Sequence, residues 1–193
     1  FHFDTEISLC GAKSECFLNK NQIPMNQVIR VGKGDVIDVR KIIHGNWLYL
    51  SISGKIISES YFDSISTYEK VEIGGNKGKK LKNGDFIKLK PLKTTDKREV
   101  PKELINNFKE KIIRVIKGPE YKLLESKIDY FSEKPFTVSP TSDRMGVRLM
   151  KIGKSIDFDI SIKSSPVVEG TIQVPPDGNP IVLMSDSQTT GGY

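Results

Sequence analysis

The sequence has 193 residues, of which 37% are hydrophobic and 28% charged, with a formal net charge of +6 at pH 7. These proportions are ordinary for a globular protein and exclude a wholly disordered chain. The lysines are scattered and no aromatic platform is interleaved with them, so the positive charge favours solubility over nucleic-acid binding. No run is long enough to span a bilayer and no signal peptide opens the chain, so we expect a cytoplasmic protein.

The two cysteines, Cys10 and Cys16, have no companion residues at a zinc-binding spacing, and the two histidines lie far from them in the sequence. We therefore predict free thiols and no metal site, as is typical of a cytosolic protein.

Short apolar stretches separated by Gly, Asn and Asp run through the first half of the chain and favour a barrel or sandwich. A break is expected at Gly11-Ala12. The predicted strands cover residues 1–9, 15–18, 28–31, 36–39, 47–53 and 86–89.

Residues 90–100 are charged and irregular, which predicts a domain boundary there. Pro101 suits the first turn of a short helix with Leu104, Ile105 and Phe108 on one face. We expect a first domain at 1–92, a linker with this helix at 93–110, and a second domain at 111–193. Within the second domain, the patterns predict strands at 112–116 and 136–138 and a helix at 121–131.

Residues 74–81, Gly-Gly-Asn-Lys-Gly-Lys-Lys-Leu, imitate a phosphate-binding loop. They are one residue short of the P-loop spacing, and a lysine stands where a magnesium-binding Ser or Thr is required, so we reject a P-loop. A glycine turn with solvated lysines is the favoured interpretation. The weaker alternative is a nest of backbone amides that binds an anion or nucleotide. Its residues would be Gly74, Gly75, Gly78 and Lys79.

Residues 139–149 crowd two arginines and an aspartate into a segment that should turn and then enter a strand. Arginine forks match the geometry of carboxylates and phosphates. Ser142, Asp143 and Arg144 could grip an anion or pair internally, and for any single arginine the internal ion pair is the stronger interpretation. The sequence shows no Ser/His/Asp or Cys/His arrangement, so no catalytic residue is assigned.

The C-terminal segment reads as a hairpin. Residues 171–174 alternate like a half-buried strand, 175–180 are rich in turn formers, and 181–184 are continuously apolar, as in a strand buried on both faces. Residues 185–190 are then entirely polar, and Gly191-Gly192 allows close backbone approach. This pattern suits either the wall of a small-ligand site or a polar turn leaving the core.

Several segments, in order, resemble the biotin-dependent carboxyltransferase family that includes the C subunit of 5-oxoprolinase, the KipA protein and part of urea carboxylase, also described as the allophanate hydrolase subunit 2 family. The matching segments are residues 9–12, 47–54, 64–67, 74–81 with 84–85, 118–121, 139–149 and 170–193. The sequence departs from the family pattern at Lys55, Asp63 and Lys79. Compared with the family pattern, we expect the first domain to lack its N-terminal part and the second to lack its C-terminal part.

The resemblance implies a mainly β fold of tandem cyclophilin-like β-barrels with a few short helices and a ligand cleft between the barrels. It implies an enzyme subunit that helps to cleave 5-oxoproline to glutamate with ATP, which could be shared with partner subunits. The partners would be a similar-fold protein, like the B subunit of 5-oxoprolinase or KipI, and the A subunit of that enzyme. Arg144, and less firmly Arg148, would bind a carboxylate or other anion. The full set of expected substrate-binding residues is Ser142, Arg144, Arg148, Gln173, Asp186, Gln188, Thr189 and Thr190.

Two other functions remain open. A KipA-like member would be a regulatory binding protein that antagonises a kinase inhibitor. A carboxyltransferase would act on a urea-like substrate, and biotin would then arrive on another protein because this chain has no Ala-Met-Lys-Met segment.

Overall fold

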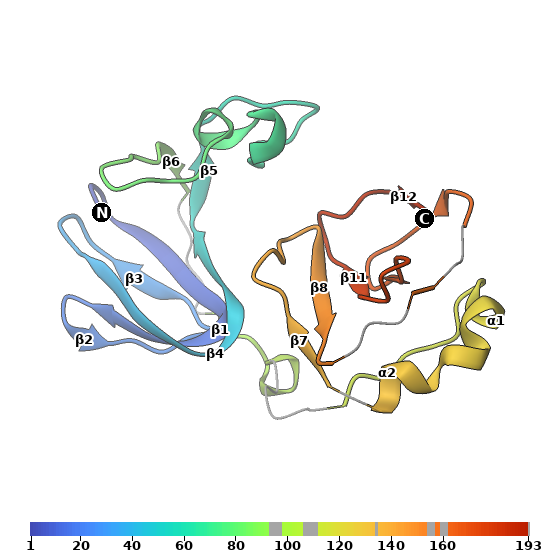
Figure 1. Cartoon of the computed structure of the whole chain (residues 1–193). Helices are drawn as coiled ribbons and strands as arrows, with labels where there is room; N and C mark the ends of the chain where they lie inside the picture. The colour runs from blue at the N-terminus through green and yellow to red at the C-terminus, as the bar shows by residue number, and fades with distance from the viewer. Residues whose placement is uncertain (93–97, 106–111, 134, 154–156, 159–161, 193) are drawn as a thin grey trace. The chain divides into compact units, whose positions relative to one another are not determined.

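The computed structural model describes residues 1–92, 98–105, 112–133, 135–153, 157–158 and 162–192. The chain divides into two compact units, Phe1–Ile113 and Arg114–Tyr193, which are described one at a time (Figure 1). The expected linker falls partly on residues 93–97 and 106–111, which lie outside the described residues, as does Phe108 of its predicted helix. No helix among the described residues is both long and apolar enough to cross a membrane.

The first unit is built on one long strand, β1 (Thr5–Leu18). It pairs antiparallel with β4 (Ile37–Ile52) over most of its length. Its other edge pairs with β3 (Ile29–Val31) near its start and with β2 (Asn21–Gln22) near its end. The strands predicted at 1–9 and 15–18 are therefore one strand, and so are those at 36–39 and 47–53. The break predicted at Gly11-Ala12 is wrong.

Gly11 explains how β1 continues. Its φ of 95° lies in the left-handed region, which glycine enters without a Cβ penalty. A Cβ there would lie 2.4 Å from the Trp47 carbonyl oxygen. The register with β4 shifts at this point, because Gly11 pairs with Leu48 but Lys13 pairs with His44. This bulge also moves the buried side chains of β1 from odd to even positions, so that Leu9 and Cys16 both enter the core.

The rest of the first unit is short segments. Strand β5 (Gly54–Ile56) pairs with β6 (Leu89–Pro91). The described residues of this unit also form the 3-10 turns η1 (Glu69–Val71), η2 (Gly75–Gly78) and η3 (Lys102–Leu104). The strand predicted at 86–89 is wrong in its bounds, because pairing begins only at Leu89. The helix predicted after Pro101 appears as the single turn η3.

The second unit contains an antiparallel sheet in the order β10 (Ile172–Gln173), β11 (Ile181–Leu183), β8 (Gly146–Lys151) and β7 (Phe136–Val138). A second ribbon pairs β9 (Ser165–Pro166) with β12 (Thr190–Gly191). The helix predicted at 121–131 is confirmed as α1 (Tyr121–Leu124), η4 (Glu125–Lys127) and α2 (Asp129–Glu133). The strand predicted at 112–116 is wrong, because these residues have no regular structure.

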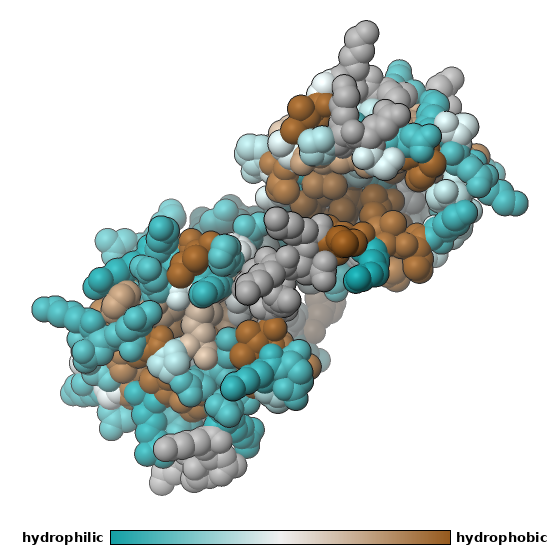
Figure 2. Space-filling model, turned by 90° about the horizontal axis from the view of Figure 1, so that it is seen from below, coloured by the Kyte–Doolittle hydropathy of each residue, from teal (hydrophilic) through white to brown (hydrophobic). Residues whose placement is uncertain are grey.

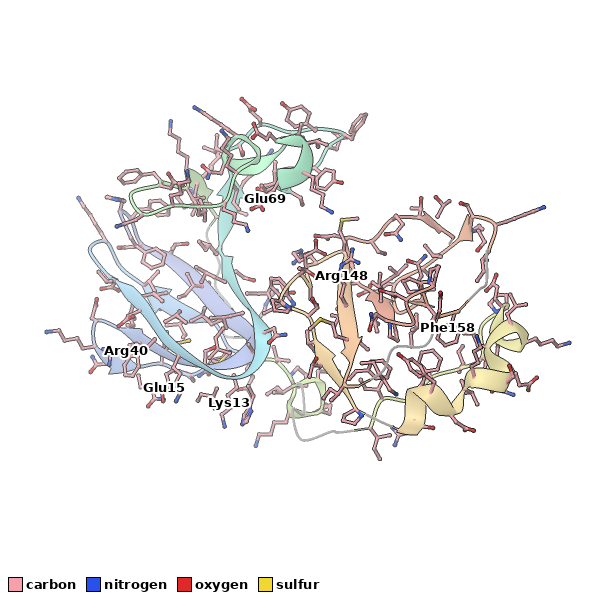
Figure 3. All side chains as sticks on the ribbon, in the orientation of Figure 1. Lys13, Glu15, Arg40, Glu69, Arg148 and Phe158 are labelled. Atoms are coloured by element: carbon pink, nitrogen blue, oxygen red, sulfur yellow. The ribbon has the colours of Figure 1, made fainter. Side chains whose placement is uncertain are left out.

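Aromatic side chains cover one face of this sheet. Tyr130 of α2 lies edge-on to Phe136 of β7 and to Phe158, with ring centroids 6.2 and 5.7 Å apart. The Lys151 ammonium lies over the Tyr130 ring and donates to the Tyr130 carbonyl oxygen. Because residues 148 and 151 of a strand point to opposite faces, Arg148 lies on the face that this cluster leaves uncovered (Figure 3).

Apolar side chains gather in a hollow of the body at the right of Figure 2, which is the second unit. In the first unit they are more scattered over the face seen there. The predicted class, mainly β with a few short helices, is confirmed.

Candidate functional site

The arginine-rich segment forms a compact turn whose own side chains hold its backbone in place. One Asp143 carboxylate oxygen accepts the amides of Met145 and Gly146, at 2.8 and 3.2 Å. The hydroxyls of Ser139 and Thr141 are hydrogen-bonded to each other, and Ser139 is only 8% exposed. Short polar residues form such turns because their side chains can replace backbone partners. Ser139 is not among the predicted site residues, although its position before Pro-Thr-Ser-Asp is typical of a turn.

Arg144 and Asp186 form a bidentate ion pair. Arg144 Nε donates to Asp186 Oδ2 at 2.6 Å and Nη2 donates to Oδ1 at 3.1 Å. The Arg144 guanidinium lowers the pKa of the Asp186 carboxyl, chiefly through this hydrogen bond. The Asp186 amide also donates to the Arg144 carbonyl oxygen. The turn and the polar C-terminal segment, both predicted to carry the site, therefore lie side by side within the second unit.

Arg148 lies in the next part of the same segment, in β8. Its backbone is held by Ser142, whose hydroxyl accepts the Arg148 amide at 3.0 Å and donates to the Arg148 carbonyl oxygen at 3.3 Å. That carbonyl oxygen also accepts the Ser139 amide. The Ser142 hydroxyl, predicted to contact substrate, is thus used to position Arg148. The Arg148 side chain is exposed, and no ion pair is found for it among the described residues.

Gln173 lies in β10, the edge strand of the sheet, and is 8% exposed. Its Oε1 accepts a hydrogen bond from Gln188 Nε2 at 3.1 Å. A Cβ on Gly191 would lie 1.8 Å from Gln173 Nε2, so the glycine makes room for this amide. The sequence suggested that Gly191-Gly192 allows another group to approach closely. In the structure that group is the Gln173 side chain, which belongs to the same unit.

Thr189 and Thr190 follow directly. Thr190 pairs with Pro166 in the β12–β9 ribbon, and the Thr189 carbonyl oxygen accepts the Val167 amide. Both side chains are exposed. The eight predicted residues therefore fall in one unit and include three contacting pairs. These pairs are Arg144 with Asp186, Ser142 with Arg148, and Gln173 with Gln188.

The glycine-rich loop in the first unit is folded tightly on itself. The amides of Gly75, Gly78 and Lys79 donate to carbonyl oxygens of Ile65, Gly74 and Asn76, respectively. Cβ atoms on Gly74 and Gly78 would lie 1.8 Å from the Ser66 oxygen and 2.0 Å from the Glu72 carbonyl carbon. Lys79 lies 4.0 Å from a Glu72 oxygen. Internal packing therefore explains the glycines, and anion binding by the loop stays a prediction.

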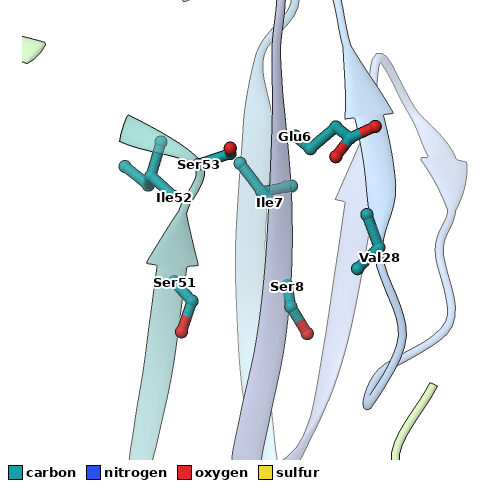
Figure 4. A pocket seen from close by; sticks show the side chains of 7 residues that line it. All are labelled: Glu6, Ile7, Ser8, Val28, Ser51, Ile52 and Ser53. Atoms are coloured by element: carbon teal, nitrogen blue, oxygen red, sulfur yellow. The ribbon is translucent and has the colours of Figure 1, made fainter. Parts of the chain in front are cut away.

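A shallow pocket of about 200 Å³ lies on the first unit. Figure 4 shows its lining, which is Glu6, Ile7, Ser8, Val28, Ser51, Ile52 and Ser53. The Glu6 carboxylate lies 3.5 Å from Nε of the mostly exposed Arg30. The lining includes none of the predicted site residues. Among the described residues, no group of three His, Cys, Asp or Glu side chains could hold a metal ion.

A family model described as carboxyltransferase domain, subdomain A and B, matches residues 1–193. The chain belongs to this carboxyltransferase-domain family. The C subunit of 5-oxoprolinase from Escherichia coli (strain K12) is 34% identical over 195 residues, covering 100% of this chain and 62% of that protein. The urea amidolyase of Saccharomyces cerevisiae is 33% identical over 163 residues, covering 78% of this chain and 9% of that protein.

Solved structures agree with this membership. The Kluyveromyces lactis urea carboxylase superposes with a TM-score of 0.81 at 28% identity, covering 100% of this chain and 19% of that one. TTHA0988 superposes with a TM-score of 0.75 at 25% identity, covering 100% and 37%. The resemblance seen in the sequence is thereby confirmed. This carboxyltransferase-domain chain spans 62% of the length of the Escherichia coli relative.

Proposed function

We propose that this carboxyltransferase-domain chain is the part of an ATP-dependent 5-oxoprolinase that corresponds to its C subunit. With partner subunits, it would open the lactam of 5-oxoproline by hydrolysis to give glutamate. The proposal is supported by the Escherichia coli relative that bears this name, which is 34% identical across the whole chain. The structural observation that carries it is the Arg144–Asp186 pair, because it joins the two segments in which a carboxylate-bearing substrate would be recognised.

The partners we propose are the similar-fold B subunit and the A subunit of such an enzyme. We propose that ATP would bind to those partners. The proposal is supported by the glycine loop, in which the amides of Gly75, Gly78 and Lys79 already donate to carbonyl oxygens. The Arg144–Asp186 pair would hold the turn beside the substrate site, and Gln188 and the two threonines would line that site.

Reconstitution tests this function. The protein that contains this chain is mixed with its partner subunits, 5-oxoproline and ATP, and glutamate is measured. We expect ATP-dependent glutamate formation, and at least a tenfold loss of it in Arg144→Ala. The control is Arg40→Ala, because Arg40 forms an exposed pair with Asp38 in the first unit. Absence of glutamate in the reconstituted wild type contradicts the function, and unchanged glutamate in Arg144→Ala contradicts the site.

Carboxyl transfer is the second candidate, supported by the TM-score of 0.81 with a urea carboxylase. In that case a partner would deliver carboxybiotin, and the carboxyl group would pass to a urea-like acceptor. Labelled bicarbonate distinguishes the two reactions. Label in the product favours carboxyl transfer, whereas unlabelled glutamate favours lactam opening.

A further inference from the structure

The two arginines of residues 139–149 differ in what they can still bind. Two donors on one edge of the Arg144 fork, Nε and Nη2, donate to Asp186 at 2.6 and 3.1 Å, and the charges of the pair cancel. A ligand carboxylate at Arg144 would have to compete with a carboxylate already held in bidentate geometry. Arg144 is therefore better suited to fix the turn than to receive a substrate.

Arg148 has the opposite properties. Its side chain is exposed, and the described residues offer its guanidinium no carboxylate partner. Its backbone is held by the Ser142 hydroxyl, by the Ser139 amide and by pairing with Ile181 in β11. A cation of this kind on a backbone fixed from both sides is preorganised to bind an anion, because little ordering of the main chain is needed on binding.

The neighbours of Arg148 on the same face of the sheet indicate the chemical class of the ligand that could bind there. The register places Arg148 opposite Ile181, and Ile181 opposite Gln173, so the three side chains form a row across β8, β11 and β10. Strands lie about 4.8 Å apart, so the row spans on the order of 10 Å between the outer Cα atoms. A small ring packed on Ile181 could then contact the Arg148 guanidinium on one side and the amides of Gln173 and Gln188 on the other.

The amide end is the Gln173–Gln188 pair. Gln188 donates through Nε2 to Gln173, and among the residues described its own Oε1 accepts no hydrogen bond. An amide oxygen that is open in this way suits a ligand N–H donor, such as that of a lactam. A guanidinium at one end and an amide oxygen at the other match a small carboxylate that also carries a lactam or amide N–H.

We propose that Arg148, and not Arg144, binds the carboxylate of a small lactam acid on the face of the β10–β11–β8–β7 sheet opposite the Tyr130 cluster. Ile181 supports the ring and Gln188 accepts the lactam N–H. The Arg144–Asp186 pair is a positioning pair. The identity of the acid as 5-oxoproline rests on the proposed function, whereas the carboxylate-binding role of Arg148 does not.

The test compares two probes that differ only in the carboxylate. Binding of 5-oxoproline and of 2-pyrrolidinone to the whole chain is measured by calorimetry or ligand-observed NMR. We expect Arg148→Gln to weaken 5-oxoproline binding at least tenfold and to leave 2-pyrrolidinone binding unchanged. Arg148→Lys should recover part of the loss, because it restores the charge without the fork. Arg114→Gln, at an exposed arginine of the same unit, is the matched control and should change neither.

Arg144→Gln separates positioning from binding. It should lower the melting temperature and weaken both probes alike, because it loosens the turn and does not remove the carboxylate contact. The proposal is overturned if Arg148→Gln binds 5-oxoproline like the wild type, if it weakens both probes equally, or if the wild type binds 5-oxoproline no better than 2-pyrrolidinone.

The reconstituted enzyme keeps this proposal distinct from the proposed function. Binding of 5-oxoproline through Arg148 without glutamate formation removes the function and keeps the carboxylate site. Glutamate formation with an unchanged KM in Arg148→Gln keeps the function and removes the carboxylate site. A raised KM with little change in kcat supports both.

Discussion

The Arg144 guanidinium and the Asp186 carboxylate, 42 residues apart in the sequence, meet through two parallel hydrogen bonds of 2.6 and 3.1 Å. A backbone bond from the Asp186 amide to the Arg144 carbonyl oxygen runs beside them. The pair therefore closes the open end of the β8–β11 pairing, where the strands have already ended. Both side chains are about half exposed, at 47% and 49%, so solvent weakens the attraction.

A double-mutant cycle on this pair should give a coupling energy of about 0.3–1 kcal/mol in urea unfolding, the range for exposed but well-formed pairs. The cycle uses Arg144→Ala, Asp186→Ala and the double variant. The Arg40–Asp38 pair, which is similarly exposed and lies two residues apart, provides the reference cycle. A coupling energy near zero at low salt would show that the bidentate geometry adds nothing to stability.

The same pair predicts a pH dependence. Because Arg144 lowers the folded-state pKa of Asp186, the stabilisation is fully present above the unfolded-state pKa of about 3.9. It is lost as the pH falls below that value and through the lower folded-state pKa. The stability difference between the wild type and Asp186→Asn should thus be present at pH 7 and shrink below pH 4. A difference that grew on acidification would contradict the sign.

Gly11→Ala should destabilise the first unit by about 2–4 kcal/mol, because it adds backbone strain at φ 95° to a Cβ that would lie 2.4 Å from the Trp47 oxygen. Gly34→Ala is the matched control. Its φ of 92° is similar, but nothing lies within 4 Å of a Cβ there. It should cost only about 1 kcal/mol. Chemical unfolding of both variants measures the difference, and equal losses would disprove the steric contribution.

The two thiols should react at different rates. Cys16 is fully buried, and this burial raises the pKa of its thiol, so the reactive thiolate is scarce. Cys10 is only partly buried. An aromatic disulfide reagent should label one thiol of the native protein and two after denaturation. In Cys10→Ser the native labelling should disappear, whereas in Cys16→Ser it should remain.

The elements that local chemistry determines are the ones the sequence predicted. The strand at Phe136–Val138, the helical segment that begins at Tyr121 and the hairpin turn at 175–180 all follow from periodicity and turn residues. The family was also recognisable, because residues 139–149 and 170–193 form long, specific segments. These features depend on neighbours within a few residues, so no knowledge of distant contacts was needed.

Other features were decided by distant partners. Gly11-Ala12 reads locally as a break, but a partner strand with extra residues turns it into a bulge within a continuous strand. Residues 112–116 have an apolar pattern, yet they form no strand in the structure. A strand needs a neighbour to accept its hydrogen bonds, and the sequence does not show which one is available.

The candidate site divides in the same way. The sequence identified Arg144, Arg148, Gln173, Asp186 and Gln188 as candidate site residues, because they carry guanidinium, amide or carboxylate groups and lie in segments that match the family. Only the tertiary structure showed which of these groups already bind one another. Arg144 is neutralised by a residue 42 positions away, and Arg148 is left open by the same arrangement. The difference arises because a charge is available to a ligand only where the fold supplies no internal counter-charge.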